Sequence, residues 1–326
     1  MNRRAFVTGS VALLAAPLAA EAQQARRVVR VGLLGVVPEE AAKPYLGALR
    51  EGLREHGWDD QNIHLDFLST DGRDDRLPEA AAELARRKVD VIIAPGDLAG
   101  LAAKQATKAI PIILAPTSDP VASGLVTTLA RPGGTVTGFS IMAPDVYAKR
   151  LELLRQVVPS VKRVAVLRNP DFPLADTNSK LLRQAAEALA FEASVFDVRD
   201  KKDFDDTFRK ITQVRANALV VIGDPLMFTH RAQIVDLALK NRLAGIFEWK
   251  EYVEVGGLMS YGADLLHMYR RVATYVDRIV RGTKAGDLPI EQPTKFELVI
   301  NLKTAKALGL TIPQSLLLRA DQVIDP

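Results

Sequence analysis

Cysteine is absent from the 326-residue sequence. Its absence excludes disulfide bonds, metal sites with cysteine ligands and a thiol nucleophile, because all three need the sulfur atom. Histidine is scarce too, and the few present form neither an H-E-x-x-H motif nor a close pair: His56, His64, His230 and His267. We therefore expect neither a metal site nor a cofactor.

A strong charge of one sign is also missing. Lys and Arg number 43 against 39 Asp and Glu, so the formal net charge is +4, and the basic residues are spread along the chain. Nucleic acid is not an expected partner, since proteins that bind it usually carry a clustered basic surface. Hydrophobic residues make up 48% of the chain, as in folded globular proteins, and the length suggests about two domains.

No hydrophobic run reaches the length of about 20 residues that spans a bilayer. The run at residues 7–20 follows the basic start Arg3-Arg4 and ends at small residues, including Ala22, that suit signal peptidase. This pattern predicts an export signal over residues 1–22, cleaved before Gln23. Arg3-Arg4 suits the twin-arginine route as well as general secretion, so both routes stay open.

The mature chain is expected to be soluble in the periplasm. Because no cysteine follows the apolar run, attachment of a lipid at cysteine is not available. Cleavage removes two positive charges and one negative charge, so the net charge falls from +4 to +3. We expect a monomer without a lipid anchor.

From Val28 onward, short β-branched runs alternate with longer helical patterns. Strands are expected at 28–34, 63–68, 89–94 and 111–115, with helices at 42–56, 76–88 and 98–108 between them. This order indicates a parallel sheet covered by helices on both faces. After a helix at 146–157 the order repeats, with strands at 163–167, 193–198, 218–224 and 244–247 and helices at 177–190, 203–214 and 228–240.

Two similar lobes explain this repetition. The run at residues 89–97 has the same outline as residues 217–224, and each lies at a similar distance from the first strand of its half. One large sheet would need about ten or more strands, which is rare. The fold class is therefore α/β, with two doubly wound, Rossmann-like lobes and a cleft between them. The remaining pieces, at 258–261, 264–281 and 296–301, are expected to complete these lobes.

Catalytic motifs are not found. The sequence has no G-x-G-x-x-G after the first strand, no P-loop and no G-x-S-x-G elbow. The paired carboxylates Asp59-Asp60, Asp74-Asp75 and Asp205-Asp206 lie on loops or at helix starts, where acidic residues usually act as caps. The chain is therefore not expected to be an enzyme.

Polar residues and glycines gather instead after the predicted strands. Open parallel α/β sheets bind ligands at this edge, and the helix N-termini there favour an anion such as a carboxylate. The segments are residues 35–38, which include Val37, and Gly96-Asp97, Thr117-Ser118-Asp119-Pro120, Asn169-Pro170, Gly223-Asp224-Pro225, Glu248-Trp249 and Tyr261-Gly262.

Three long runs resemble the substrate-binding proteins of ABC importers, specifically the tryptophan/tyrosine-type family. They are residues 119–140 (DPVASGLVTTLARPGGTVTGFS), 257–271 (GLMSYGADLLHMYRR) and 288–324 (LPIEQPTKFELVINLKTAKALGLTIPQSLLLRADQVI). The likeness covers essentially the whole mature chain. The sequence differs at Thr135, where the family usually has asparagine, and at Arg168, where an aromatic residue is expected. Arg168 could pair with an acidic ligand group or point to solvent.

The resemblance implies a type I periplasmic binding protein whose two lobes close on a ligand by a hinge. The chain would cross between the lobes near Ile141, Met259 and Gln292. Lobe 1 would comprise residues 23–141 and 260–292, and lobe 2 residues 142–259 and 293–326. The implied function is that of an ABC importer component that delivers its ligand to a membrane permease. A periplasmic sensor for a membrane receptor is the alternative, followed by a two-lobed enzyme.

The expected ligand is a small organic molecule, amino-acid-like or an aromatic carboxylate. Ser118 and the N–H groups after Gly96 would hold its carboxylate, and Asp119 or Asp224 its ammonium group. Aromatic side chains would pack on its apolar part, with Phe172 and Phe228 among the candidates. The full set of expected ligand-binding residues is Val37, Gly96, Asp97, Thr117, Ser118, Asp119, Phe139, Asn169, Asp224, Pro225, Trp249 and Tyr261.

Overall fold

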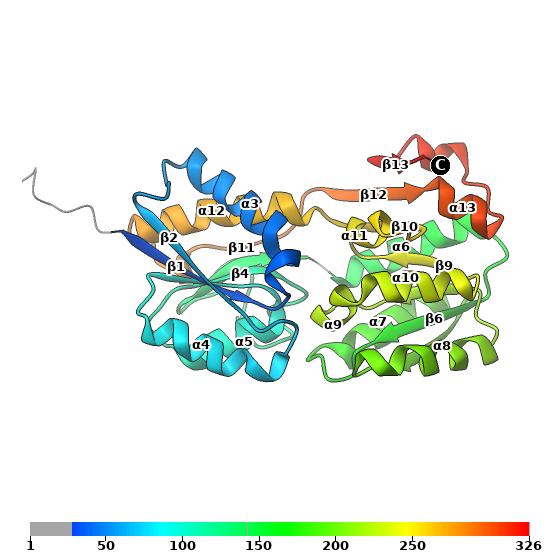
Figure 1. Cartoon of the computed structure of the whole chain (residues 1–326), viewed down its shortest axis with the longest axis horizontal. Coiled ribbons are helices and arrows are strands. Elements are labelled where there is room, and N and C mark those ends of the chain that lie inside the picture. The colour runs from blue at the N-terminus through cyan, green and yellow to red at the C-terminus, as the bar shows by residue number, and fades with distance from the viewer. Residues whose placement is uncertain (1–27, 142, 326) are drawn as a thin grey trace, which may run out of the picture.

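The computed structural model describes residues 28–141 and 143–325, with the backbone alone for residues 143–145. The predicted export signal over residues 1–22 lies outside the described residues. Two lobes lie side by side, each built on its own sheet (Figure 1). The predicted α/β fold with two lobes is confirmed.

The first lobe is built on a six-stranded parallel sheet in the order β11-β5-β4-β3-β1-β2. Its strands are β1 (Val29–Gly35), β2 (Ile63–Ser69), β3 (Val91–Ala94), β4 (Ile112–Thr117), β5 (Val136–Ser140) and β11 (Ile290–Glu291). The central strands are rich in Val, Ile and Leu and are buried, because helices cover both faces of the sheet. The helices of this lobe are α3 (Glu39–Glu55), α4 (Leu77–Arg86), α5 (Gly96–Ala106) and α12 (Leu265–Val280), with short 3₁₀ turns at η1 (Asp74–Arg76) and η3 (Ala285–Asp287).

The second lobe has a seven-stranded sheet in the order β13-β12-β10-β9-β8-β6-β7, in which β12 runs antiparallel to β10. Its strands are β6 (Arg163–Arg168), β7 (Glu192–Asp197), β8 (Ala218–Val221), β9 (Ala244–Phe247), β10 (Met259–Ala263), β12 (Phe296–Asn301) and β13 (Gln322–Ile324). Its helical segments are α6 (Ala143–Val157), α7 (Ala175–Ala188), η2 (Lys201–Asp203), α8 (Phe204–Gln213), α9 (Pro225–Thr229), α10 (Arg231–Lys240), α11 (Lys250–Glu254), α13 (Leu302–Leu308) and α14 (Gln314–Leu317). No helix among the described residues is long and apolar enough to cross a membrane.

The second crossing between the lobes differs from its expected place near Met259. All five residues of β10 pair with β12, and Met259 and Ser260 also pair with β9, so the strand belongs entirely to the second sheet. The chain therefore leaves this lobe after Ala263 and enters the first lobe through α12. The apolar run that predicted the strand ends at Tyr261, but pairing with β12 extends it through Ala263.

Several further elements differ from the sequence-based expectation, and two of them have a clear physical reason. Strand β5 was not expected, because Gly138 interrupts its β-branched pattern. Gly138 has a φ of +132°, and a Cβ at this position would overlap the backbone of Leu114 on β4. The helix expected at residues 228–240 is divided into α9 and α10 at His230, whose ψ of 19° departs from helical geometry.

One hydrophobic cluster extends through both lobes. It includes Val31 and Leu33 of β1 in the first lobe and Leu167 of β6 and Phe208 of α8 in the second, all 2% exposed or less. A second cluster fills the other side of the second sheet, and a third packs α4 and α5 on the first sheet. The shared cluster implies that the lobes are in contact along the cleft rather than separated.

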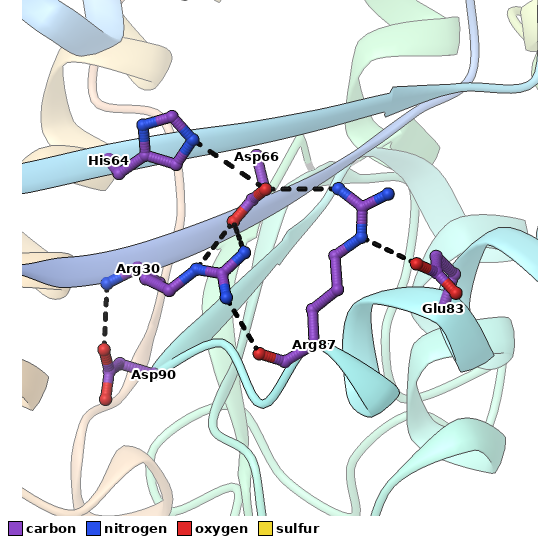
Figure 2. A network of polar contacts seen from close by, with 6 residues as sticks. All are labelled: Arg30, His64, Asp66, Glu83, Arg87 and Asp90. Carbon is purple, nitrogen blue, oxygen red and sulfur yellow. Dashed lines mark hydrogen bonds and ion pairs between the residues drawn. The ribbon is translucent and has the colours of Figure 1, made fainter.

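A charged network joins three elements of the first lobe toward the amino ends of its strands (Figure 2). Asp66 on β2 is 8% exposed and accepts hydrogen bonds from two arginines. Its Oδ2 lies 2.8 Å from Nη2 of Arg30 on β1, and its Oδ1 lies 3.2 Å from Nη1 of Arg87, just after α4. Arg87 also pairs with Glu83 at 2.8 Å. The network ties β1, β2 and α4 together in the amino-terminal half of these strands, away from the cavity.

Candidate functional site

A cavity lies between the two lobes, at the carboxyl ends of both sheets. It contains about 710 Å³ of space not filled by protein, part of it open to solvent. The first lobe contributes residues that follow β1, β3, β4 and β5, and the second lobe contributes residues that follow β6, β8 and β9. The position agrees with the rule that open parallel sheets bind ligands at this edge.

Asp97 and Ser118 form the polar part of the first lobe's wall. Asp97 is the second residue of α5 and is 1% exposed. Its Oδ2 accepts a hydrogen bond of 3.0 Å from the backbone N–H of Ser118 at the end of β4. Burial raises the pKa of Asp97, against the opposing effect of that N–H. The bond fixes two loops of the first lobe to each other beside the cavity.

Asp224 provides the corresponding carboxylate in the second lobe. It is the N-cap of α9, and its Oδ1 accepts a hydrogen bond of 2.8 Å from the N–H of Met227. Its Oδ2 is buried and has no hydrogen-bond partner within the described chain. Burial raises the pKa of Asp224 to about 7, although the N–H of Met227 and the nearby amide of Asn169 act in the other direction. A cationic ligand group at Oδ2 would therefore favour the ionised form.

Aromatic rings form one wall of the cavity and continue from lobe to lobe. Tyr269 of α12 lies 5.1 Å from Tyr45 of α3, between ring centroids, and Tyr45 lies 6.4 Å from Phe228 of α9. Phe228 in turn meets Trp249 edge-on at 5.3 Å. All four rings line the cavity. Such a wall suits an apolar or aromatic ligand side chain.

The described lining residues include no lysine, arginine or histidine. One cation is among the buried residues of the described chain, Arg150 on α6, which is 1% exposed. Its Nε donates a hydrogen bond of 2.7 Å to the carbonyl of Tyr261, and its Nη2 lies 3.6 Å from Oε1 of Glu248. Any carboxylate in the cavity would therefore depend on hydroxyl and backbone N–H donors, such as those near Ser118.

The structure brings together many of the residues that the sequence predicted for ligand binding. Those that line the cavity are Val37, Gly96, Asp97, Ser118, Asp224, Pro225 and Trp249. Asn169 is 7% exposed beside Asp224, and its Oδ1 accepts a hydrogen bond from the N–H of Asp171 at 3.0 Å. A direct role of these residues in binding stays a prediction.

Other predicted residues lie outside the described lining and have structural contacts. Thr117 donates a hydrogen bond of 3.1 Å to the carbonyl of Phe139, and Phe139 packs on Tyr275 within the first lobe. Oδ1 of Asp119 accepts hydrogen bonds of 3.0 Å from the backbone N–H groups of Val121 and Ala122. Tyr261 stacks on Phe296 at 5.7 Å in the second lobe. Each of these four side chains therefore has a contact within the protein, and its role in ligand binding stays a prediction.

Several lining residues were not in the predicted set. They are Val36, Tyr45, Pro95, Ala115, Pro116, Ile141, Gly223, Leu265 and Tyr269, while Phe172 and Phe228, named from the sequence as candidate ring contacts, line the cavity as well. The lining residues directly after strands could have been found from the same signal as the predicted residues beside them, which is their position at the end of a strand. Tyr45 and Tyr269 lie on the apolar faces of helices, and no local pattern separates a ring in the core from a ring at the cavity.

Arg168, which replaces an expected aromatic residue, is paired within the second lobe. Its Nε lies 2.7 Å from Asp197, and its Nη1 lies 2.6 Å from Asp176. Arg168 is therefore held by two carboxylates of its own lobe and is not among the described cavity residues.

The chain matches the family model of the ABC transporter substrate binding proteins over residues 30–324. The chain belongs to this family. It is thus a substrate-binding component rather than an enzyme, as the sequence predicted. It works outside the cytoplasm, with a small-molecule ligand and the membrane part of a transporter as its partners.

The chain is similar to proteins whose ligands are known. The chain is 27% identical over 277 residues to the tyrosine-binding protein of Clostridioides difficile (strain R20291), covering 83% of this chain and 77% of the relative. A solved domain in complex with L-Trp from Streptococcus pneumonia has a TM-score of 0.85 and 26% identity, covering 91% of this chain and all of that one. A ligand-free, open substrate binding protein from Clostridium difficile has a TM-score of 0.68 and 25% identity, covering 92% and 99%.

Proposed function

We propose that this protein captures an α-amino acid with an apolar or aromatic side chain between its lobes and delivers it to the permease of an ABC importer. The observation that carries the proposal is the cavity itself. It combines a buried carboxylate oxygen on Asp224, which lacks a partner in the described chain, with a wall of aromatic rings. These features match an ammonium group and an apolar side chain on one small molecule.

The three parts of the ligand have separate partners in this proposal. Asp224 accepts the ammonium group, and the rings of Tyr45, Phe228 and Trp249 contact the side chain. The hydroxyl of Ser118 donates to the carboxylate, since the N–H of Ser118 is already bonded to Asp97. The tyrosine-binding relative and the structure in complex with L-Trp support this ligand class.

The lobe arrangement is consistent with capture. The structure resembles the L-Trp complex more than the ligand-free, open relative, with TM-scores of 0.85 and 0.68 at almost equal sequence identity. We infer that the lobes are closed here, and that ligand contacts to both lobes stabilise this state. We also propose that the protein acts in the periplasm as a soluble monomer without a lipid anchor, exported by its cleaved signal.

A thermal-shift screen tests the ligand class. L-tryptophan, L-tyrosine and L-phenylalanine are compared with indole-3-propionate, which lacks the ammonium group, and tryptamine, which lacks the carboxylate. A true ligand at about 100 times its Kd adds about 2.7 kcal/mol, which raises the Tm by about 5 °C in a chain of this size. If none of the amino acids shifts the Tm, the proposal is wrong.

Titration calorimetry with Asp224→Asn tests the ammonium site. Asparagine keeps the N-cap of α9 but removes the charge, so the fold should be retained. We expect the affinity for the amino acid found in the screen to fall at least about tenfold, because an ammonium group would be buried without its counter-charge. Unchanged affinity would remove Asp224 from the site.

A further inference from the structure

A side-chain hydrogen bond crosses the cleft between the lobes. The hydroxyl of Tyr45 on α3 donates to Oε1 of Glu251 on α11 at 2.8 Å. Helix α3 packs on α12 in the first lobe, whereas α11 packs on β10 and β12 in the second. The two residues are 206 positions apart in sequence, so only closure of the lobes brings them together.

The surroundings of Tyr45 hold its ring in place for this contact. Tyr45 is 7% exposed and packs between Tyr269 of its own lobe and Phe228 of the other. Opening of the lobes would therefore break the phenol–carboxylate hydrogen bond and the contact between Tyr45 and Phe228. In the open state water would hydrate the phenol and the carboxylate. The closed state is therefore stabilised by the net free energy of the hydrogen bond over this hydration.

Glu251 is not among the described residues that line the cavity, whereas Tyr45 is. A change at Glu251 therefore acts on the ligand only through Tyr45 and the lobe positions. This separates the hydrogen bond from direct ligand contact.

We propose that Tyr45 and Glu251 are a positioning pair that holds the lobes closed without ligand and slows ligand release. The proposal deepens the proposed function, since it explains how capture is made long-lived. The apparent affinity for a ligand scales with the fraction of protein in the binding-competent state. A protein that is already partly closed therefore binds more tightly than one that must close first. Ligand then adds its own contacts to a closed state that exists before binding.

The lobe positions can be measured without ligand. The chain has no cysteine, so Gln105→Cys on α5 and Gln213→Cys on α8, both exposed, give two unique spin-label sites, one in each lobe (Figure 1). Pulsed electron–electron double resonance then measures the distance between the two spin labels, and its distribution gives the closed and open populations. We expect a closed population in the ligand-free protein, and Tyr45→Phe should lower the closed-to-open ratio about tenfold, as for loss of a hydrogen bond to a charged group.

Three further variants test the pair. Glu251→Ala should reproduce the effect of Tyr45→Phe, and the double variant should show little further loss, because both changes remove one interaction. Glu251→Gln should keep much of the closed population, since its amide oxygen still accepts the phenol hydrogen. The matched control is Tyr275→Phe, which removes a hydroxyl bonded to Glu291 at 3.2 Å within the first lobe and should leave the populations unchanged.

The outcome is decided without knowing the ligand. A ligand-free protein that is entirely open, or a distribution unchanged by both Tyr45→Phe and Glu251→Ala, overturns the proposal, as does an equal effect of Tyr275→Phe. If L-tryptophan binds, Glu251→Ala should also raise its dissociation rate about tenfold. Failure of every amino acid to bind would contradict the proposed function, while the ligand-free distances would still decide the positioning pair.

Discussion

At the residue scale, the described lining of the cavity carries two buried carboxylates and no cation. Asp224 has a pKa raised to about 7, and Asp97 a pKa raised in the same direction, both chiefly by burial. A bound ammonium group would offset this cost for Asp224. Protonation of the Asp224 carboxyl would therefore oppose the binding of a ligand ammonium group.

This opposition predicts that ligand binding releases protons. Below pH 7 the carboxyl of Asp224 is mostly protonated in the free protein, and a bound ammonium group lowers its pKa and expels the proton. At pH 6 we expect release of up to about one proton per ligand, decreasing to none near pH 9, where Asp224 is already ionised. Affinity should rise with pH over the same interval.

Calorimetry in buffers of different ionisation enthalpy measures this release. Asp224→Asn serves as the control, because it cannot titrate, and its proton release should be lost. Equal release by the wild type and this variant would assign the titration to another group.

At the element scale, α3 packs closely on α12 in the first lobe. Gly52 of α3 faces α12, and a Cβ there would overlap the carbonyl oxygen of Arg270. Gly47 lies in the same helix, but a Cβ there would meet no atom within 4 Å. The two glycines thus occupy the same helix for different reasons.

Alanine substitutions should therefore have opposite effects. Gly47→Ala should raise the free energy of unfolding by about 0.5–1 kcal/mol, because alanine restricts the unfolded chain and suits a helix. Gly52→Ala should lower it by about 1–3 kcal/mol, since α3 and α12 must separate. Urea unfolding measures both, and a loss of stability for Gly47→Ala would contradict the explanation.

At the scale of the whole molecule, each lobe is assembled from separate parts of the chain. The first lobe needs α12 and β11, which come from residues 265–291, to cover α3 and to pair with β5. Helix α12 buries a full apolar face, including Tyr269, Val272 and Val276. Without this face, one side of the first sheet would be open to water.

A fragment of residues 28–141 should therefore not fold cooperatively. We expect it to bind a hydrophobic dye and to melt without a sharp transition by circular dichroism, because it lacks the cover of α12. A chain in which residues 264–291 follow residue 141 through a short linker should regain the transition. A cooperative transition in the shorter fragment would show that α12 is dispensable.

Most of the local structure could be predicted from the sequence, because strand and helix periods are local. The strand of residues 163–168 and the helix of residues 265–280 follow from their apolar patterns. Strand β5 could not, since Gly138 breaks its pattern and only the close approach of Leu114 explains the glycine. Likewise Asp224 and Trp249 were predicted from strand ends, whereas Tyr269 was not.

The sequence by itself determined the α/β class, the two lobes and the edge where the polar loops gather, because these follow from composition and spacing along the chain. Only the tertiary structure decided which rings face the cavity, and that Tyr45 meets Glu251 of the other lobe. The reason is that a helical period shows which face of a helix is buried, but not which element buries it. That choice is made when segments far apart in sequence cross between the lobes and pack.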